Sequence, residues 1–192
     1  MWFVLFSPWT KSLLNFWIGM TLFSGSLALA SLLIAKEKTV EIFKFKQSYI
    51  WIGIISAAFL YLIFFIGDIV VKSVFDFAKV EIESIYSTKS QASTIKIGLL
   101  LLLVIAPAEE IFWRGFVQRK YSEKWGKWRG FLFAVIVYSL VHVWSFNLML
   151  IGAAMVAGLF WGFMYLKYDS IVPGIISHAV WDLFIFVIYP IN

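Results

Sequence analysis

Residues 101–114 read LLLVIAPAEEIFWR and place two adjacent carboxylates and an arginine inside an otherwise apolar run. Insertion scales put one charged side chain at the centre of a spanning helix at roughly 2.5 to 3.5 kcal/mol. Glu110 and Arg114 are four residues apart on one helix face, so we predict that they pair and neutralise each other. Adjacent helical residues differ by about 100° in direction. Glu109 is therefore left to face the interior of a bundle, where it is a candidate general base or acid.

The composition around this stretch is that of a membrane protein. Of the 192 residues, 62% are hydrophobic and 14% are charged, whereas soluble domains carry about 25% charged residues. Apolar runs of the length needed to cross a bilayer recur between polar breaks. These runs are residues 12–35, 49–71, 97–117, 130–144, 148–166 and 171–188. We predict an all-α, polytopic transmembrane helix bundle with about six spans. It would be a multi-pass integral protein of a bacterial inner (plasma) membrane.

Most lysines and arginines lie in short loops beside the apolar runs, which explains the net charge of +5 without a nucleic-acid partner. One loop carries Lys36, Lys38, Lys44 and Lys46, and another carries Arg119, Lys120, Lys124, Lys127 and Arg129. The positive-inside rule places both loops in the cytoplasm and the N-terminus outside. The chain has no cysteine, so thiolate metal sites and a cysteine nucleophile are excluded.

We divide the chain into residues 1–94, with two transmembrane helices and an amphipathic loop, and residues 95–192, a four-helix catalytic core. Between residues 72 and 96, apolar side chains recur at helical spacing among charged and hydroxyl residues. They are Val74, Phe75, Ala78, Ile82 and Ile85. We expect an interfacial helix here, placed where it could cover the active site.

The chain's two histidines, His142 and His178, both fall within apolar runs of the second half. A lone buried histidine is more often a core residue than a catalyst, but both lie in spans that accompany an intramembrane glutamate pair, which favours function. His178 and Asp182 are four residues apart, so the carboxylate can orient the imidazole. Tyr138 and His142 have the same spacing. At about 1.5 Å per helical residue, the two histidines and Glu109 reach similar depths near mid-membrane.

The sequence thus contains three motifs on three separate predicted helices: Glu-Glu-x-x-x-Arg from Glu109, Tyr-x-x-x-His from Tyr138, and His-x-x-x-Asp from His178. In order and spacing they resemble the CAAX prenyl endopeptidase type II and bacterial Abi (CPBP) family of intramembrane proteases, over about residues 95–190. Two positions depart from the commonest pattern, with Tyr138 in place of Phe and Asp182 in place of Asn. A carboxylate cannot donate as the Asn amide can, which puts the oxyanion-binding role of that position in doubt.

The resemblance implies a catalytic set of Glu109, His142, His178 and Asp182, supported by Glu110, Arg114 and Tyr138. In this family's chemistry, Glu109 with His142 would activate a water for attack on a peptide carbonyl. His178 with Asp182 would bind or stabilise the tetrahedral oxyanion.

The cofactor is unknown from sequence. Glu109, His142 and His178 could hold a zinc ion with an open position for water. The compact zinc signature His-Glu-x-x-His is absent, however, and the candidate ligands come from separate helices. We slightly prefer water activation without a metal.

The function expected is that of an endopeptidase that cleaves a membrane-embedded or lipid-anchored protein or peptide, in protein maturation or in bacteriocin self-immunity. The alternative is a non-catalytic membrane binding protein or chaperone that uses the same polar cluster. A proton-coupled transporter is a weaker alternative, since the sequence has no internal repeat. The identity of the substrate cannot be read from the sequence.

Overall fold

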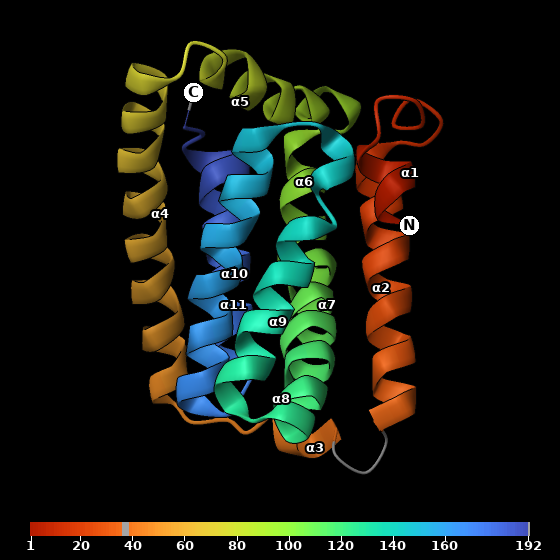
Figure 1. Ribbon diagram of the computed structural model, residues 1–192, viewed down its shortest axis with the longest axis vertical. Helices are drawn as coiled ribbons and strands as arrows, with labels where there is room; N and C mark the ends of the chain where they lie inside the picture. Colours follow the sequence, from red (N-terminus) through yellow and green to blue (C-terminus); the bar gives the residue numbers. More distant parts are fainter. Residues whose placement is uncertain (36–38, 192) are drawn as a thin grey trace.

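The computed structural model describes residues 1–35 and 39–191, and every regular element in these two ranges is a helix (Figure 1). Four helical segments are long and apolar enough to cross a membrane. They are α2 (Phe16–Ala35), α4 (Ser48–Val74), the segment Lys127–Ser145 that begins with α9 (Lys127–Leu140), and α10 (Leu148–Tyr168). The all-α class and the membrane character of the chain follow from this arrangement.

Two of the predicted spans are not among these four. The sixth is the shorter apolar helix Val172–Ile188, made of α11 (Val172–Leu183) and η6 (Phe184–Ile188). The third is helical throughout and is built from several pieces: α6 (Thr94–Leu100), η3 (Leu101–Ile105), α7 (Ala106–Glu110), η4 (Ile111–Gln118) and α8 (Arg119–Trp125). It lies beside α9 and α10 in the bundle (Figure 1).

The helix of the third predicted span is widened on both sides of the glutamate pair, because η3 and η4 are π-helical. Pro107 has no N–H and its ring crowds the preceding turn, so the normal hydrogen-bond pattern cannot continue through it. The Ala106 N–H bonds instead to the Leu101 carbonyl, five residues back. Such π-helical turns are frequent at functional sites. Glu109 and Glu110 thus lie on a short α-helical turn between two widened ones.

A helical segment lies across one end of the bundle, at the top of Figure 1. It consists of α5 (Ala78–Tyr86) and the 3₁₀ turn η2 (Ser87–Gln91). Asn147 donates to the Glu81 carbonyl over 2.8 Å, and the Trp17 indole donates to the Thr88 carbonyl over 2.9 Å. These bonds join α5 to the start of α10 and η2 to the start of α2. The expected helix between residues 72 and 96 is therefore present.

The remaining elements are short. At the same end lie α1 (Trp2–Phe6) and the 3₁₀ turn η5 (Val143–Ser145), and at the opposite end lies α3 (Thr39–Ile42). Asn147 caps α10 by accepting from the Leu150 N–H.

The long helices of the two halves pack on each other through small residues. A Cβ atom at Gly53 of α4 would lie 2.5 Å from the Ile176 side chain of α11, so only glycine permits this approach. Buried Leu60, Trp161 and Trp181 form part of the core shared by α4, α10 and α11. Our division at residue 94 stays a prediction. Of the residues used for the membrane orientation, Lys36 and Lys38 lie outside the described ranges.

Candidate functional site

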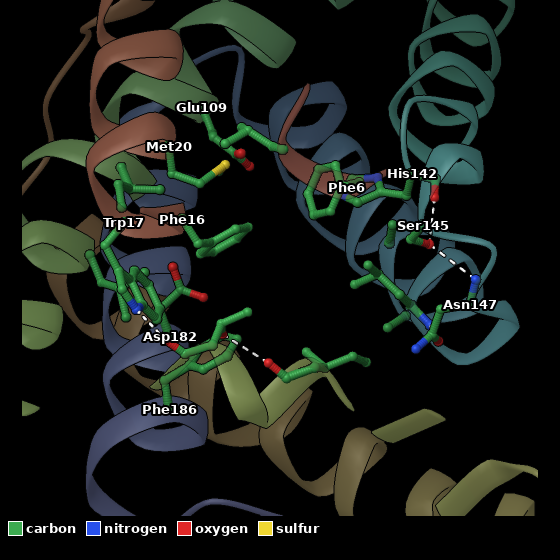
Figure 2. A pocket seen from close by; sticks show the side chains of 18 of the residues that line it. Phe6, Phe16, Trp17, Met20, Glu109, His142, Ser145, Asn147, Asp182 and Phe186 are labelled. Carbon is green, nitrogen blue, oxygen red and sulfur yellow. Dashed lines mark hydrogen bonds between the residues drawn. The ribbon is translucent and has the colours of Figure 1, made fainter. Parts of the chain in front are cut away.

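A cavity of about 400 Å³ lies inside the bundle and opens beside α5 and η2. Among its lining side chains are Glu109, Tyr138, His142, His178 and Asp182. Figure 2 shows Glu109, His142 and Asp182 around the same open space, with aromatic side chains such as Phe6 and Phe16 between them. The three motifs expected to form one site therefore do meet. The polar groups reach the cavity from three places: α7, the end of α9 with the turn that follows it, and α11.

The two glutamates point to different neighbours, as their adjacent positions on a helix require. Glu109 turns toward α9, where the Tyr138 hydroxyl donates to its Oε2 over 3.2 Å. Its side chain lines the cavity, and the residue is only 6% exposed. Glu109 thus keeps one carboxylate oxygen bonded to a phenol while it borders space that a substrate can fill.

Glu110 is fully buried and contacts two side chains, Arg114 and His178. The Arg114 Nη1 lies 2.9 Å from its Oε1, which confirms the predicted pair. The same oxygen lies 2.9 Å from Nδ1 of His178, a contact that the sequence did not suggest. A Cβ atom at Gly174 would lie 3.1 Å from the other carboxylate oxygen. The lack of a side chain there lets α11 approach Glu110 closely.

His142 lies in the turn after α9, not within the helix as its place in an apolar run suggested. Its Nδ1 is 2.8 Å from the Tyr138 carbonyl oxygen. A carbonyl oxygen only accepts, so Nδ1 carries a proton, and Nε2 has the free lone pair when the ring is neutral. The ring of Phe6 packs against the imidazole, with centroids 4.9 Å apart. The turn therefore presents to the cavity an imidazole whose Nδ1 is bonded to the backbone and whose Nε2 is left for other partners.

His178 faces a carboxylate at each ring nitrogen. Its Nε2 is 3.5 Å from Asp182 Oδ2, longer than its 2.9 Å contact to Glu110. The predicted pairing with Asp182 is thus present but is the weaker of the two, since N–H···O bonds are usually 2.7–3.2 Å long. A protonated imidazole would find an acceptor for both of its N–H groups.

Trp161 of α10 is a site residue that the sequence reasoning missed. Its ring lies on the His178 imidazole, with centroids 3.6 Å apart and planes 16° apart. Its Nε1 donates to the Ser177 hydroxyl over 3.2 Å, which fixes the ring. The Arg114 guanidinium lies 4.9 Å from the centre of the Tyr138 ring and 5.6 Å from that of Trp161. A tryptophan at mid-span, away from the interfaces where such rings usually lie, was the available signal.

The candidate metal ligands do not form a metal site in this arrangement. Within residues 1–35 and 39–191, no three His, Asp or Glu side chains are grouped closely enough to hold a metal ion. Glu109, His142 and His178 line one cavity but approach different partners. We therefore derive no step through a metal.

Comparison with known proteins agrees with the motifs. The family model described as Type II CAAX prenyl endopeptidase Rce1-like matches residues 91–184. This segment contains all three motifs and Trp161, whereas Phe6, Phe16 and the residues of α5 beside the cavity lie before it. No curated protein and no solved structure matches the chain.

Proposed function

Because the chain belongs, through residues 91–184, to the Rce1-like type II CAAX prenyl endopeptidase family, we propose that it is an intramembrane endopeptidase. Its substrate would be a membrane-associated protein or peptide, cleaved in protein maturation or in bacteriocin self-immunity. The observation that carries this proposal is the meeting of Glu109, His142, His178 and Asp182 at one cavity large enough for a peptide segment.

Water activation is assigned to Glu109 and His142. Both groups line the cavity, and both have a fixed orientation, through the Tyr138 hydroxyl and the Tyr138 carbonyl respectively. Glu109 takes a proton from a water molecule as the water oxygen forms a bond to the scissile carbonyl carbon. The lone pair on His142 Nε2 can accept the second hydrogen bond of that water. The result is a tetrahedral intermediate with a negative charge on the former carbonyl oxygen.

Stabilisation of that oxyanion is assigned to His178. Its Nδ1 is held by Glu110, while its Nε2 contact to Asp182 is long. The Nε2–H group can therefore turn from Asp182 to the oxyanion as negative charge develops. Asp182 is assigned the role of orienting the imidazole. This role needs only a hydrogen-bond acceptor, so it does not depend on the donor that an Asn at this position would supply. When the C–N bond breaks, protonated Glu109 returns its proton to the leaving amine.

The proposal is tested by comparing the wild type with Glu109→Gln in the same membrane. Glutamine keeps the size of the side chain and can still accept from Tyr138, but it cannot take a proton from water. Glu83→Gln is the matched control, because Glu83 is an exposed glutamate of α5 outside the cavity lining. Membrane fractions from cells that hold equal amounts of each protein are compared for new peptide N-termini.

New termini should appear with the wild type and with Glu83→Gln, and should be absent with Glu109→Gln. Identical termini for all three proteins would contradict proteolysis. That result would favour a non-catalytic protein that binds its partner through the same polar cluster.

A further inference from the structure

The two ends of the bundle differ in their basic residues. The end that holds α3 and α8 is at the bottom of Figure 1. Its described lysines and arginines are Lys44, Lys46, Arg119, Lys120, Lys124, Lys127, Arg129 and Lys167. The opposite end, with α1, α5 and η2, has Lys11, Lys72, Lys79, Lys89 and Lys96. The excess of positive charge places the α3 and α8 end in the cytoplasm.

The cavity opens at the other end. Next to the catalytic groups, the cavity is lined by the turns of the helices that lie toward the top of Figure 1. Nearer its opening, it is lined by polar residues of the segments across that end. These rim residues are Lys11, Ser12, Ser84, Ser87, Thr88, Gln91, Ser145 and Asn147. Residues of α3 and α8 do not contribute to the lining of this cavity. Several of them, such as Ile42, Arg119 and Glu123, border a separate cavity of about 300 Å³.

Together, the charge asymmetry and the direction of the cavity point to one orientation of the site. We propose that the active site is reached from the extracytoplasmic face of the membrane. Its substrates are then exported or membrane-anchored polypeptides whose cleaved bond lies in, or next to, the outer leaflet. This inference names the substrate class of the proposed protease and therefore rests on the function proposed above, but the orientation itself can be measured without any proteolysis.

The chemistry of the cavity fits a peptide segment of such an exported or membrane-anchored polypeptide. Apart from Lys11, the rim is formed by hydroxyl and amide side chains, which suit the neutral main chain of a peptide. Below the rim, the wall is formed by apolar side chains such as Phe16, Met20 and Phe186 (Figure 2). A peptide that bonds through its backbone at the rim and packs apolar side chains against the wall is the expected ligand. Such a sequence is found where an exported segment adjoins a membrane span.

Cysteine labelling tests the orientation directly, since the chain has no cysteine of its own. Ser87→Cys introduces a thiol at the exposed cavity rim, and Ser48→Cys introduces one at the exposed start of α4, at the basic end. Both substitutions exchange a hydroxyl for a thiol at an exposed position. Intact spheroplasts are treated with a membrane-impermeant maleimide, before and after permeabilisation.

Ser87→Cys should be labelled in intact spheroplasts and Ser48→Cys only after permeabilisation. The opposite pattern, or labelling of both positions from the same side, would overturn the proposal and leave the protease function untouched. A second measurement uses the cleaved termini defined by the Glu109→Gln comparison. They should map to extracytoplasmic segments of their parent proteins. Termini in cytoplasmic segments would reject this substrate class, whereas the absence of any Glu109-dependent termini would reject proteolysis itself.

Discussion

Glu110 and His178 are joined by a 2.9 Å contact between Oε1 and Nδ1, across two helices that are far apart in the sequence. The same oxygen is paired with Arg114. Glu110 therefore does more than neutralise the arginine on its own helix, because it links the third predicted span to the imidazole assigned to the oxyanion. The paired glutamates thus have separate roles: Glu109 borders the cavity, and Glu110 contacts Nδ1 of His178, the ring nitrogen that is not assigned to the oxyanion.

Replacement of Glu110 by alanine should destabilise the protein more than loss of any exposed charge. The change leaves the buried Arg114 without its carboxylate, and removal of one partner of a buried pair costs about 3–5 kcal/mol. Thermal unfolding in detergent measures the effect. The matched control is Glu83→Ala, which should change stability by less than about 0.5 kcal/mol. Equal melting temperatures for the two variants would contradict a structural role for the pair.

Tyr138→Phe should lower the rate while leaving the fold in place. The variant removes the hydroxyl that donates to Glu109 and keeps the ring that packs against Arg114. Hydrogen bonds to charged groups contribute about 1.5–3 kcal/mol, so we expect a rate about tenfold or more below the wild type. Cleavage of a substrate identified in the Glu109→Gln comparison measures this rate. An unchanged rate with an unchanged melting temperature would show that the hydroxyl does not assist Glu109.

Much of this architecture could be predicted from the sequence, because the bilayer restricts the choice. Long apolar runs must form helices whose backbone groups bond internally, and the helices follow the predicted runs to within a few residues, except that helix continues to Trp125 beyond the third run. The fixed geometry of a helix also gave the Glu110–Arg114 pair and the divergence of Glu109 from Glu110. These are relationships within one helix, so spacing alone determines them.

Relationships between helices were harder to predict. The contact of Glu110 with His178 and the stacking of Trp161 on His178 depend on how α7, α10 and α11 pack. Hydropathy does not specify how each helix is rotated about its own axis against its neighbours. His142 was placed in a helix because the apolar run continues past it, whereas the structure turns there. The π-helical turns beside Pro107 were also missed, although the proline was a sign that the helix could not be regular.

The stacking of Trp161 on His178 leads to a prediction about orientation. Trp161→Ala should reduce activity strongly, since the imidazole loses the surface that keeps it in the plane set by Glu110. Trp161→Phe keeps an aromatic face but loses the bond to Ser177, worth about 1 kcal/mol. We expect Trp161→Phe to recover most of the activity lost in Trp161→Ala. If both variants lose activity equally while both remain folded, the indole bond and not the stacking orients His178.

A last prediction concerns metal. Within the described residues, the carboxylates and imidazoles at the cavity are not grouped as metal ligands; instead, His178 Nδ1 lies within hydrogen-bonding distance of Glu110, and Glu109 accepts from Tyr138. We therefore expect Glu109-dependent cleavage to survive treatment of the purified protein with a strong zinc chelator. The measurement compares cleavage rates before chelation, after chelation and after zinc is restored, with a zinc protease of known dependence as the positive control. Loss of activity that zinc restores would contradict the prediction. It would mean that Glu109, His142 and His178 move together when metal or substrate binds, and that Glu109 acts as a ligand in place of a free base.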